Sequence, residues 1–160
     1  MIARSIAISV SLITVMVAAY YLLPWNGHGA RALLFRMGFG LVLLVVATIL
    51  SIKNVLRSQY PILRAFEALG LVVGFAVVSF ASLYVFISSR SVTSFSEVLG
   101  KTDGLYFSLT TATTIGYGDI TAQTEGARIV VMIQMVVNVV VVGVAARAII
   151  AAARRRGEVR

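Results

Sequence analysis

Long apolar stretches alternate with short polar segments along the chain. Four of these stretches carry few charged residues, and they run from about 5–23, 32–52, 66–89 and 126–153. A membrane-spanning helix needs about 20 mostly apolar residues to cross roughly 30 Å of hydrocarbon. Arg36 falls in the first turn of the second stretch, where its side chain can reach the lipid headgroups. The pattern therefore predicts an all-α integral membrane protein with four transmembrane helices.

A fifth uncharged stretch, residues 104–118, has a different character. It is only 15 residues long and is rich in threonine and glycine. It is too short and too polar to cross a bilayer. Non-helical backbone at membrane depth is tolerated only where it is buried in protein or lines water. We therefore predict a re-entrant segment between the third and fourth transmembrane helices.

The composition excludes several classes of function. Hydrophobic residues make up 59% of the chain and charged residues 12%, against about 25% charged in average soluble domains. With no cysteine and one histidine, the chain has neither a disulfide framework, nor a thiolate metal site, nor a two-histidine cluster. No nucleophile–base pair stands out either. We expect neither an enzyme nor a cofactor.

The positive charge is distributed unevenly between the two sides of the predicted membrane. The net charge of +8 could indicate nucleic acid binding, but in so apolar a chain it is more typical of cytoplasmic helix ends. With the N-terminus inside, nine basic residues lie on the cytoplasmic side and five outside. We therefore predict a multi-pass protein of the cell membrane with both termini in the cytoplasm and no nucleic acid partner. The re-entrant segment then enters from outside. The first apolar stretch is longer than a signal-peptide core, so we interpret it as a retained helix.

Residues 103–119 combine a short helix with a glycine-containing strand. Thr102 and Asp103 provide a helix start, and the helix would direct its partly negative C-terminal end toward the bilayer centre. Gly116 and Gly118 allow the backbone to alternate between left-handed and right-handed conformations. The carbonyl groups of such a strand can all turn to one side, and several strands around an axis would form rings of oxygens for a dehydrated cation.

The ten residues from Thr110 to Asp119, Thr-Thr-Ala-Thr-Thr-Ile-Gly-Tyr-Gly-Asp, resemble the pore signature of the potassium channel family. The resemblance covers residues 67–147, and the whole chain is similar to small bacterial channels with two helices ahead of a two-helix pore module. It implies passive, potassium-selective conduction. Because each chain has one filter segment, it also implies a homotetramer.

The resemblance divides the chain into three parts. Two N-terminal transmembrane helices occupy residues 1–60, a pore module residues 61–153 and a short basic cytoplasmic tail residues 154–160. The pore module comprises an outer helix (66–89), a pore helix (103–113), a filter (114–119) and an inner helix (126–153).

The resemblance also assigns roles to residues. It implies K⁺ sites at the backbone carbonyls of Thr114, Ile115, Gly116 and Tyr117, with the Thr114 hydroxyl, and Gly118 belongs to the same filter. Tyr117 would point away from the ion. The residues expected to support the filter are Tyr106, Phe107, Thr110 and Thr113, and Tyr117 would pack against the first two. Asp119 would lie at the outer mouth, where its charge concentrates cations.

Two positions depart from the family pattern. Some relatives carry a glutamate at the position of Thr110, where it holds the aspartate behind the filter, so Asp119 lacks that partner here. Many relatives have a glycine hinge where this chain has Asn138. Gly143 could replace the hinge, or the helix could stay straight.

The inner helix contributes candidate cavity and gating residues, namely Asn138, Val142, Gly143 and Ala146. Gln134 and Asn138 are four residues apart and therefore share a helix face. They could line the cavity or form hydrogen bonds between subunits. Arg147 could reach the inner pore mouth or the headgroups.

No helix has the row of arginines that voltage sensing requires, and the tail is too short for a ligand-binding domain. The stretch Arg154, Arg155 and Arg156 could bind anionic lipid or serve only as a topological anchor. Two other functions stay open: a weakly selective cation channel and a non-conducting membrane subunit. A disrupted or degenerate Gly-Tyr-Gly would indicate these, and the intact motif favours potassium selectivity.

Overall fold

The computed structural model describes residues 2–22 and 61–157, and this part of the chain is helical apart from the connecting segments. Its helices are α1 (Ile2–Leu22), α3 (Pro61–Arg90), α4 (Lys101–Ala112) and α5 (Glu125–Gly157). The second predicted transmembrane helix, 32–52, lies outside the described residues.

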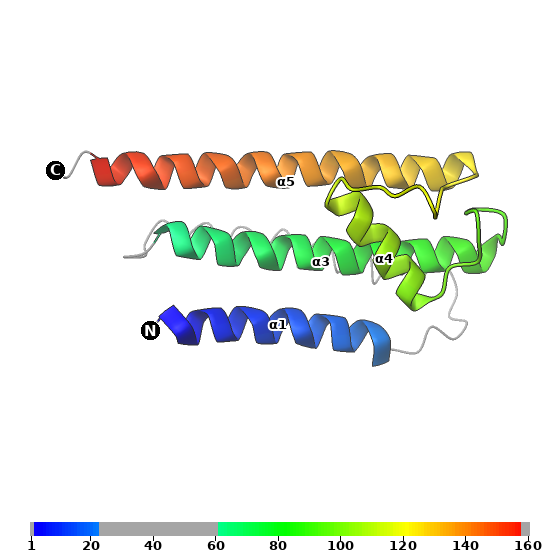
Figure 1. Cartoon of the computed structure of the whole chain (residues 1–160), viewed down its shortest axis with the longest axis horizontal. Helices are drawn as coiled ribbons and strands as arrows, with labels where there is room; N and C mark the ends of the chain where they lie inside the picture. Colours follow the sequence, from blue (N-terminus) through cyan, green and yellow to red (C-terminus); the bar gives the residue numbers. More distant parts are fainter. Residues whose placement is uncertain (1, 23–60, 158–160) are drawn as a thin grey trace.

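The long helices α1, α3 and α5 lie side by side, and the short helix α4 crosses α3 obliquely near one end (Figure 1). α3 and α5 run antiparallel. The chain enters along α4, turns, and returns as an extended segment to the end of the molecule where α4 began (Figure 1). The start of α1 and the end of α5 lie at the opposite end.

The helix bounds differ from the predicted ones by a few residues. α3 begins at Pro61 rather than at residue 66, since proline at the first helical position needs no N–H partner. α4 begins two residues early, at Lys101, because the backbone N–H of Gly100 donates to Asp103 Oδ2 at 2.9 Å and thereby ties down the first turn. α5 continues to Gly157, so the residues assigned to the start of a separate tail, Arg154, Arg155 and Arg156, extend the helix instead.

Two of the helices are long and apolar enough to span a membrane. In the described part of the chain these spans are Leu69–Arg90, with 22 residues, and Glu125–Val144, with 20 residues. α1 contributes a shorter apolar segment, Ile13–Leu22. Two spans flanking α4 therefore frame the segment that carries the glycine motif.

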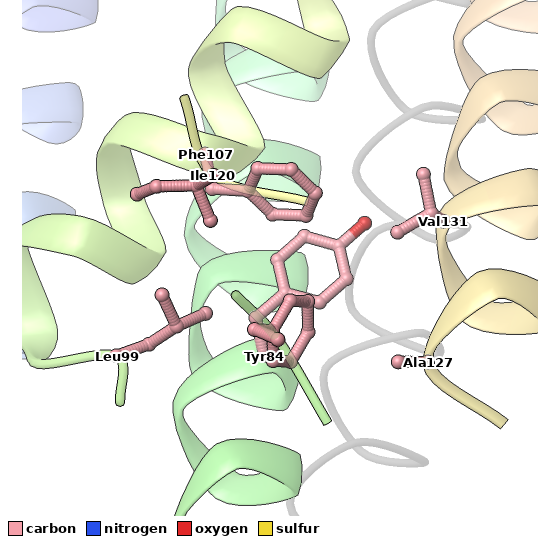
Figure 2. Close-up of a cluster of buried hydrophobic side chains, with 7 residues drawn as sticks. Tyr84, Leu99, Phe107, Ile120, Ala127 and Val131 are labelled. Atoms are coloured by element: carbon pink, nitrogen blue, oxygen red, sulfur yellow. The ribbon is translucent and has the colours of Figure 1, made fainter. Parts of the chain in front are cut away.

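A cluster of buried hydrophobic side chains fixes α4 between α3 and α5 (Figure 2). Tyr84 of α3 lies at its centre, with its ring centroid 5.0 Å from that of Phe107 and 5.7 Å from that of Phe95. The remaining members are Leu99, Ile120, Ala127 and Val131. The cluster thus joins three helices, the loop after α3 and the segment after the glycine motif into one unit, and this unit positions the candidate site.

Candidate functional site: the segment after α4

The end of α4 passes directly into the glycine motif and stays tied to it. Thr113 caps the helix, and its N–H donates to the carbonyl of Leu109 at 2.9 Å. The carbonyl of Thr110 then accepts the N–H groups of both Ile115, at 3.0 Å, and Gly116, at 3.2 Å. The first half of the motif is therefore fixed to the last turn of α4 through one backbone oxygen.

The backbone of the motif alternates in handedness. The φ angles of Thr114, Gly116 and Gly118 are 60°, 51° and 81°, and the two residues between them are not among the positive-φ positions. This alternation turns successive carbonyl groups toward one side of the segment. In the described part of the chain, none of the carbonyl oxygens from Thr114 to Gly118 accepts a hydrogen bond. The segment therefore offers a row of free oxygens, which is the donor set that a dehydrated monovalent cation requires.

Thr114 is the unusual member of this alternation. A β-branched residue at positive φ is a genuine outlier and costs about 1–3 kcal/mol. Sequence reasoning found the two glycines but not this conformation, because nothing in threonine's own preference signals it. The bond from Thr114 N–H to the carbonyl of Thr111, at 3.2 Å, helps to hold the strained residue in place.

Two large side chains of the motif are exposed in the single chain. Ile115 is 56% and Tyr117 70% exposed. A Cβ atom built on Gly116 or Gly118 would meet nothing within 4 Å. The glycines are therefore required by their positive φ angles rather than by crowding.

Tyr106 of α4 supports the motif at two points. Its ring stacks on that of Tyr117, with centroids 6.5 Å apart and planes inclined by 3°. Its hydroxyl donates to Asp119 Oδ2 at 2.6 Å. The sequence left Asp119 without the glutamate partner of some relatives, and the structure supplies a different one, because Tyr106 lies within reach one helical turn before Thr110.

This contact also changes the acidity of both groups. The hydrogen bond from Tyr106, with help from backbone N–H groups, holds the pKa of Asp119 below its ordinary value despite partial desolvation. The same bond, together with desolvation and the carboxylate charge, raises the pKa of Tyr106 to about 12. Across the neutral range, Asp119 therefore stays charged and Tyr106 stays protonated as the donor.

The other residues expected to support the filter act differently. The ring of Phe107 does not pack against Tyr117 within the chain, because α4 turns it into the hydrophobic cluster, 5.6 Å from Phe95. Thr110 is buried and its hydroxyl donates back to Phe107 O at 3.1 Å, so it reaches the motif only through its carbonyl. The Thr113 hydroxyl likewise donates to a carbonyl of its own helix, Leu109 O, at 2.8 Å.

The return limb after the motif is paired with the loop after α3. Ser96 N–H donates to Thr121 O at 2.9 Å, and Gln123 N–H donates to Ser94 O at 2.8 Å. Thr121 N–H donates in turn to Ser96 Oγ at 3.0 Å. The sequence pattern does not indicate this pairing, because single loop hydrogen bonds leave no periodic signal.

A network of buried hydrogen bonds joins α3, α4 and α5. Gln134 of α5 is fully buried, and its Nε2 donates to Ser108 O at 2.9 Å and to Ser108 Oγ at 3.1 Å. Tyr84 donates its hydroxyl to Gln134 Oε1, and Ser108 Oγ donates to Val77 O at 2.8 Å. The two interpretations left open for Gln134, cavity lining and bonding between subunits, are therefore both wrong, since its amide is used within the chain.

Asn138 lies one turn further along α5. Its Nδ2 atom is buried but meets no acceptor among the described residues of the chain. The other cavity and gating candidates are exposed in the single chain, namely Val142, Gly143 and Ala146. Arg147 is exposed as well. α5 is one continuous helix from Glu125 to Gly157 (Figure 1) and therefore includes Gly143, whose role as a hinge stays a prediction.

Two apolar helices flank a short helix and an extended segment with a row of free carbonyl groups. This arrangement defines an ion-conducting membrane module. A family model described as an ion channel matches residues 71–155, more than half of the chain. The chain therefore belongs to this ion channel family, which is the two-helix, potassium-channel type, and it is a membrane protein rather than an enzyme. No curated protein and no solved structure matches the chain. α1 lies outside the matched region.

Proposed function

We propose that the chain conducts K⁺ selectively and passively through a filter formed by four copies around a common axis. The observation that carries this proposal is the alternation of φ at Thr114, Gly116 and Gly118 together with the row of unbonded carbonyls. One such row cannot replace a full hydration shell, whereas four rows can surround the ion with stacked rings of oxygens. The K⁺ sites would lie at the carbonyls of Thr114, Ile115, Gly116 and Tyr117.

The charges around this segment suit a cation. The last turn of α4 directs the partly negative end of its dipole toward the motif. Asp119 carries a charge at the other end of the motif, held by Tyr106. An ion therefore meets negative potential on both sides of the row of carbonyls.

The unpaired surface of α5 supports assembly into a tetramer. Its apolar side chains remain exposed along most of the apolar part of the helix, for example Val136 at 63% and Val139 at 72%. The buried Asn138 Nδ2 also lacks an acceptor within the described residues of the chain. In the proposed tetramer, neighbouring chains, the cavity or lipid cover this surface.

The membrane topology is part of the same proposal. It has four spanning helices, both termini in the cytoplasm, α4 entering from outside and Arg154, Arg155 and Arg156 near anionic headgroups on the inner side. The location is the cell membrane.

The reversal potential of the purified protein in a planar bilayer tests the proposal, with K⁺ on one side and Na⁺ on the other. We expect a value near the K⁺ equilibrium limit and a particle mass of four chains. Gly116→Ala should remove the potassium preference or the current, because a Cβ disfavours φ at +51°. Gly70→Ala is the matched control, since its Cβ would also meet nothing within 4 Å but lies in the helix α3.

Other results would favour the alternatives. A current with a reversal potential near zero indicates a weakly selective cation channel. A stable dimer without current indicates a non-conducting subunit. An unchanged K⁺ preference in Gly116→Ala contradicts the filter assignment.

A further inference from the structure

The C-terminal end of α1 meets the first turn of α4 through polar contacts made by both helices. Tyr20 donates its hydroxyl to Lys101 O at 2.7 Å. Lys101 Nζ donates back to Tyr21 O, also at 2.7 Å. The Tyr21 hydroxyl lies 3.2 Å from Thr102 Oγ1. We call these four residues the α1–α4 clamp.

The clamp uses donors from both helices and satisfies the C-terminal end of α1. The carbonyl of Tyr21 is one of the last four of α1 and has no partner within an α-helix, so the Lys101 ammonium caps it with a charge of favourable sign. The contact is therefore reciprocal.

Close packing holds the clamp in register. Tyr20 is 3% exposed. A Cβ on Gly104 would lie 3.4 Å from the Tyr20 hydroxyl, 3.0 Å from Ala81 O and 2.5 Å from Val85 Cγ2. Only glycine lets α4 approach α3 this closely, and the Tyr20 hydroxyl of α1 then lies at contact distance. The first turn of α4 is therefore fixed on two sides, by α3 within the channel module and by α1 outside it.

The opposite end of α4 holds the filter. α4 has 12 residues and is therefore about 18 Å long. A tilt of about 5° at one end displaces the other by about 1.5 Å over that length. Because Thr110 O binds the N–H groups of Ile115 and Gly116, such a tilt would move the row of carbonyls directly.

We infer that α1 is a positioning element of the channel, whose clamp on the first turn of α4 holds the filter in its conducting arrangement. This inference rests on the proposed function. It assigns Tyr20, Tyr21, Lys101 and Thr102 a role in the balance between conducting and non-conducting states, with no contact to the ion itself.

Single-channel recording of the full-length protein in K⁺ solution tests this role. Tyr20→Phe and Lys101→Met each remove one clamp hydrogen bond and keep the apolar bulk. We expect each variant to lower the ratio of conducting to non-conducting time about fivefold, the effect of one net hydrogen bond. The reversal potential and the mass of four chains should stay as in the parent. The control is Val15→Ala, on the same helix at a 62% exposed position, which should leave the ratio unchanged.

The pair Tyr21 and Thr102 allows a double-mutant cycle, because both groups of this contact are side chains. Tyr21→Phe and Thr102→Val should each reduce the ratio, and the double variant should reduce it no further than either single one. Additive effects, or a conducting ratio unchanged in Tyr20→Phe and Lys101→Met, overturn the inference. Loss of the tetramer in these variants also overturns it, because the contacts would then serve assembly alone.

A measurement that does not depend on current separates this inference from the proposed function. If the parent passes no current, the proposed function fails, and amide hydrogen exchange of residues 104–113 decides about the clamp. Faster exchange there in Tyr20→Phe than in Val15→Ala supports a restraint of α4 by α1. Equal exchange refutes it.

Discussion

The buried amide of Gln134 allows a sharp test of how α5 holds α4. Gln134→Leu keeps nearly the same volume but removes the acceptor of the Tyr84 hydroxyl and the donor to Ser108. Ser108 remains satisfied, because its hydroxyl still donates to Val77 O at 2.8 Å. The Tyr84 hydroxyl has no such alternative among the contacts described, and both Tyr84 and Gln134 are fully buried.

The expected magnitude follows from this orphaned donor. A buried donor left without an acceptor costs about 1–3 kcal/mol. Side-chain hydrogen bonds between membrane helices average about 0.6 kcal/mol and reach about 1.7 kcal/mol. We therefore expect Gln134→Leu to lower the free energy of unfolding by about 2 kcal/mol, which is a factor of about 30 in the unfolding equilibrium. Tyr84→Phe should cost less, about 1 kcal/mol, because Gln134 Nε2 keeps both contacts to Ser108.

The double variant decides whether the contact is the cause. Removing both partners leaves no buried donor, so Tyr84→Phe with Gln134→Leu should be about 1–2 kcal/mol more stable than the sum of the single effects predicts. Unfolding of the reconstituted protein by detergent titration, followed by circular dichroism, gives these energies. Met135→Leu, at the adjacent 50% exposed position, is the control. Strictly additive single effects would refute the network as the link between α3, α4 and α5.

Two further predictions concern the motif and its support. Because the pKa of Asp119 is lowered, its contribution to the stability of the folded state is complete above the ordinary carboxyl range. This contribution is lost only as external pH falls through the lowered pKa. Currents should therefore be insensitive to external pH between about 8 and 5. Tyr106→Phe removes the main cause of the shift, so the acid limb of the current–pH curve should move to higher pH, and an identical curve would contradict the Tyr106–Asp119 bond. Gly104→Ala should destabilise the protein by about 1–3 kcal/mol through overpacking, since its Cβ would lie 2.5 Å from Val85 Cγ2 and 3.0 Å from Ala81 O. The control Gly126→Ala, with nothing within 4 Å, should be neutral or stabilising, and equal melting temperatures of the two variants would exclude this close approach.

The sequence by itself determined that the chain is a membrane protein of the channel family. It also determined the approximate positions of the helices at the two ends of the channel module. Long apolar stretches leave few alternatives to a transmembrane helix, since every backbone polar group must be satisfied internally in lipid. The helix bounds of α3 and α4 differ from the prediction by five residues or fewer. The two glycines at alternating positions likewise indicated the backbone that the motif adopts, because few other residues tolerate positive φ.

Only the tertiary structure decided which side chains face one another. The sequence spacing of Tyr106 and Phe107 made both equal candidates to support Tyr117, and the direction of α4 between its neighbours sent one ring to the motif and the other to the core. The partner of Asp119, the use of Gln134 within the chain and the contact of α1 with Lys101 are all long-range. Local periodicity fixes which face of a helix is apolar, but it contains no information on which groups of other elements lie opposite that face. The positive φ of Thr114 has the same origin, because a β-branched residue adopts it only where the surrounding hydrogen bonds over-determine the backbone.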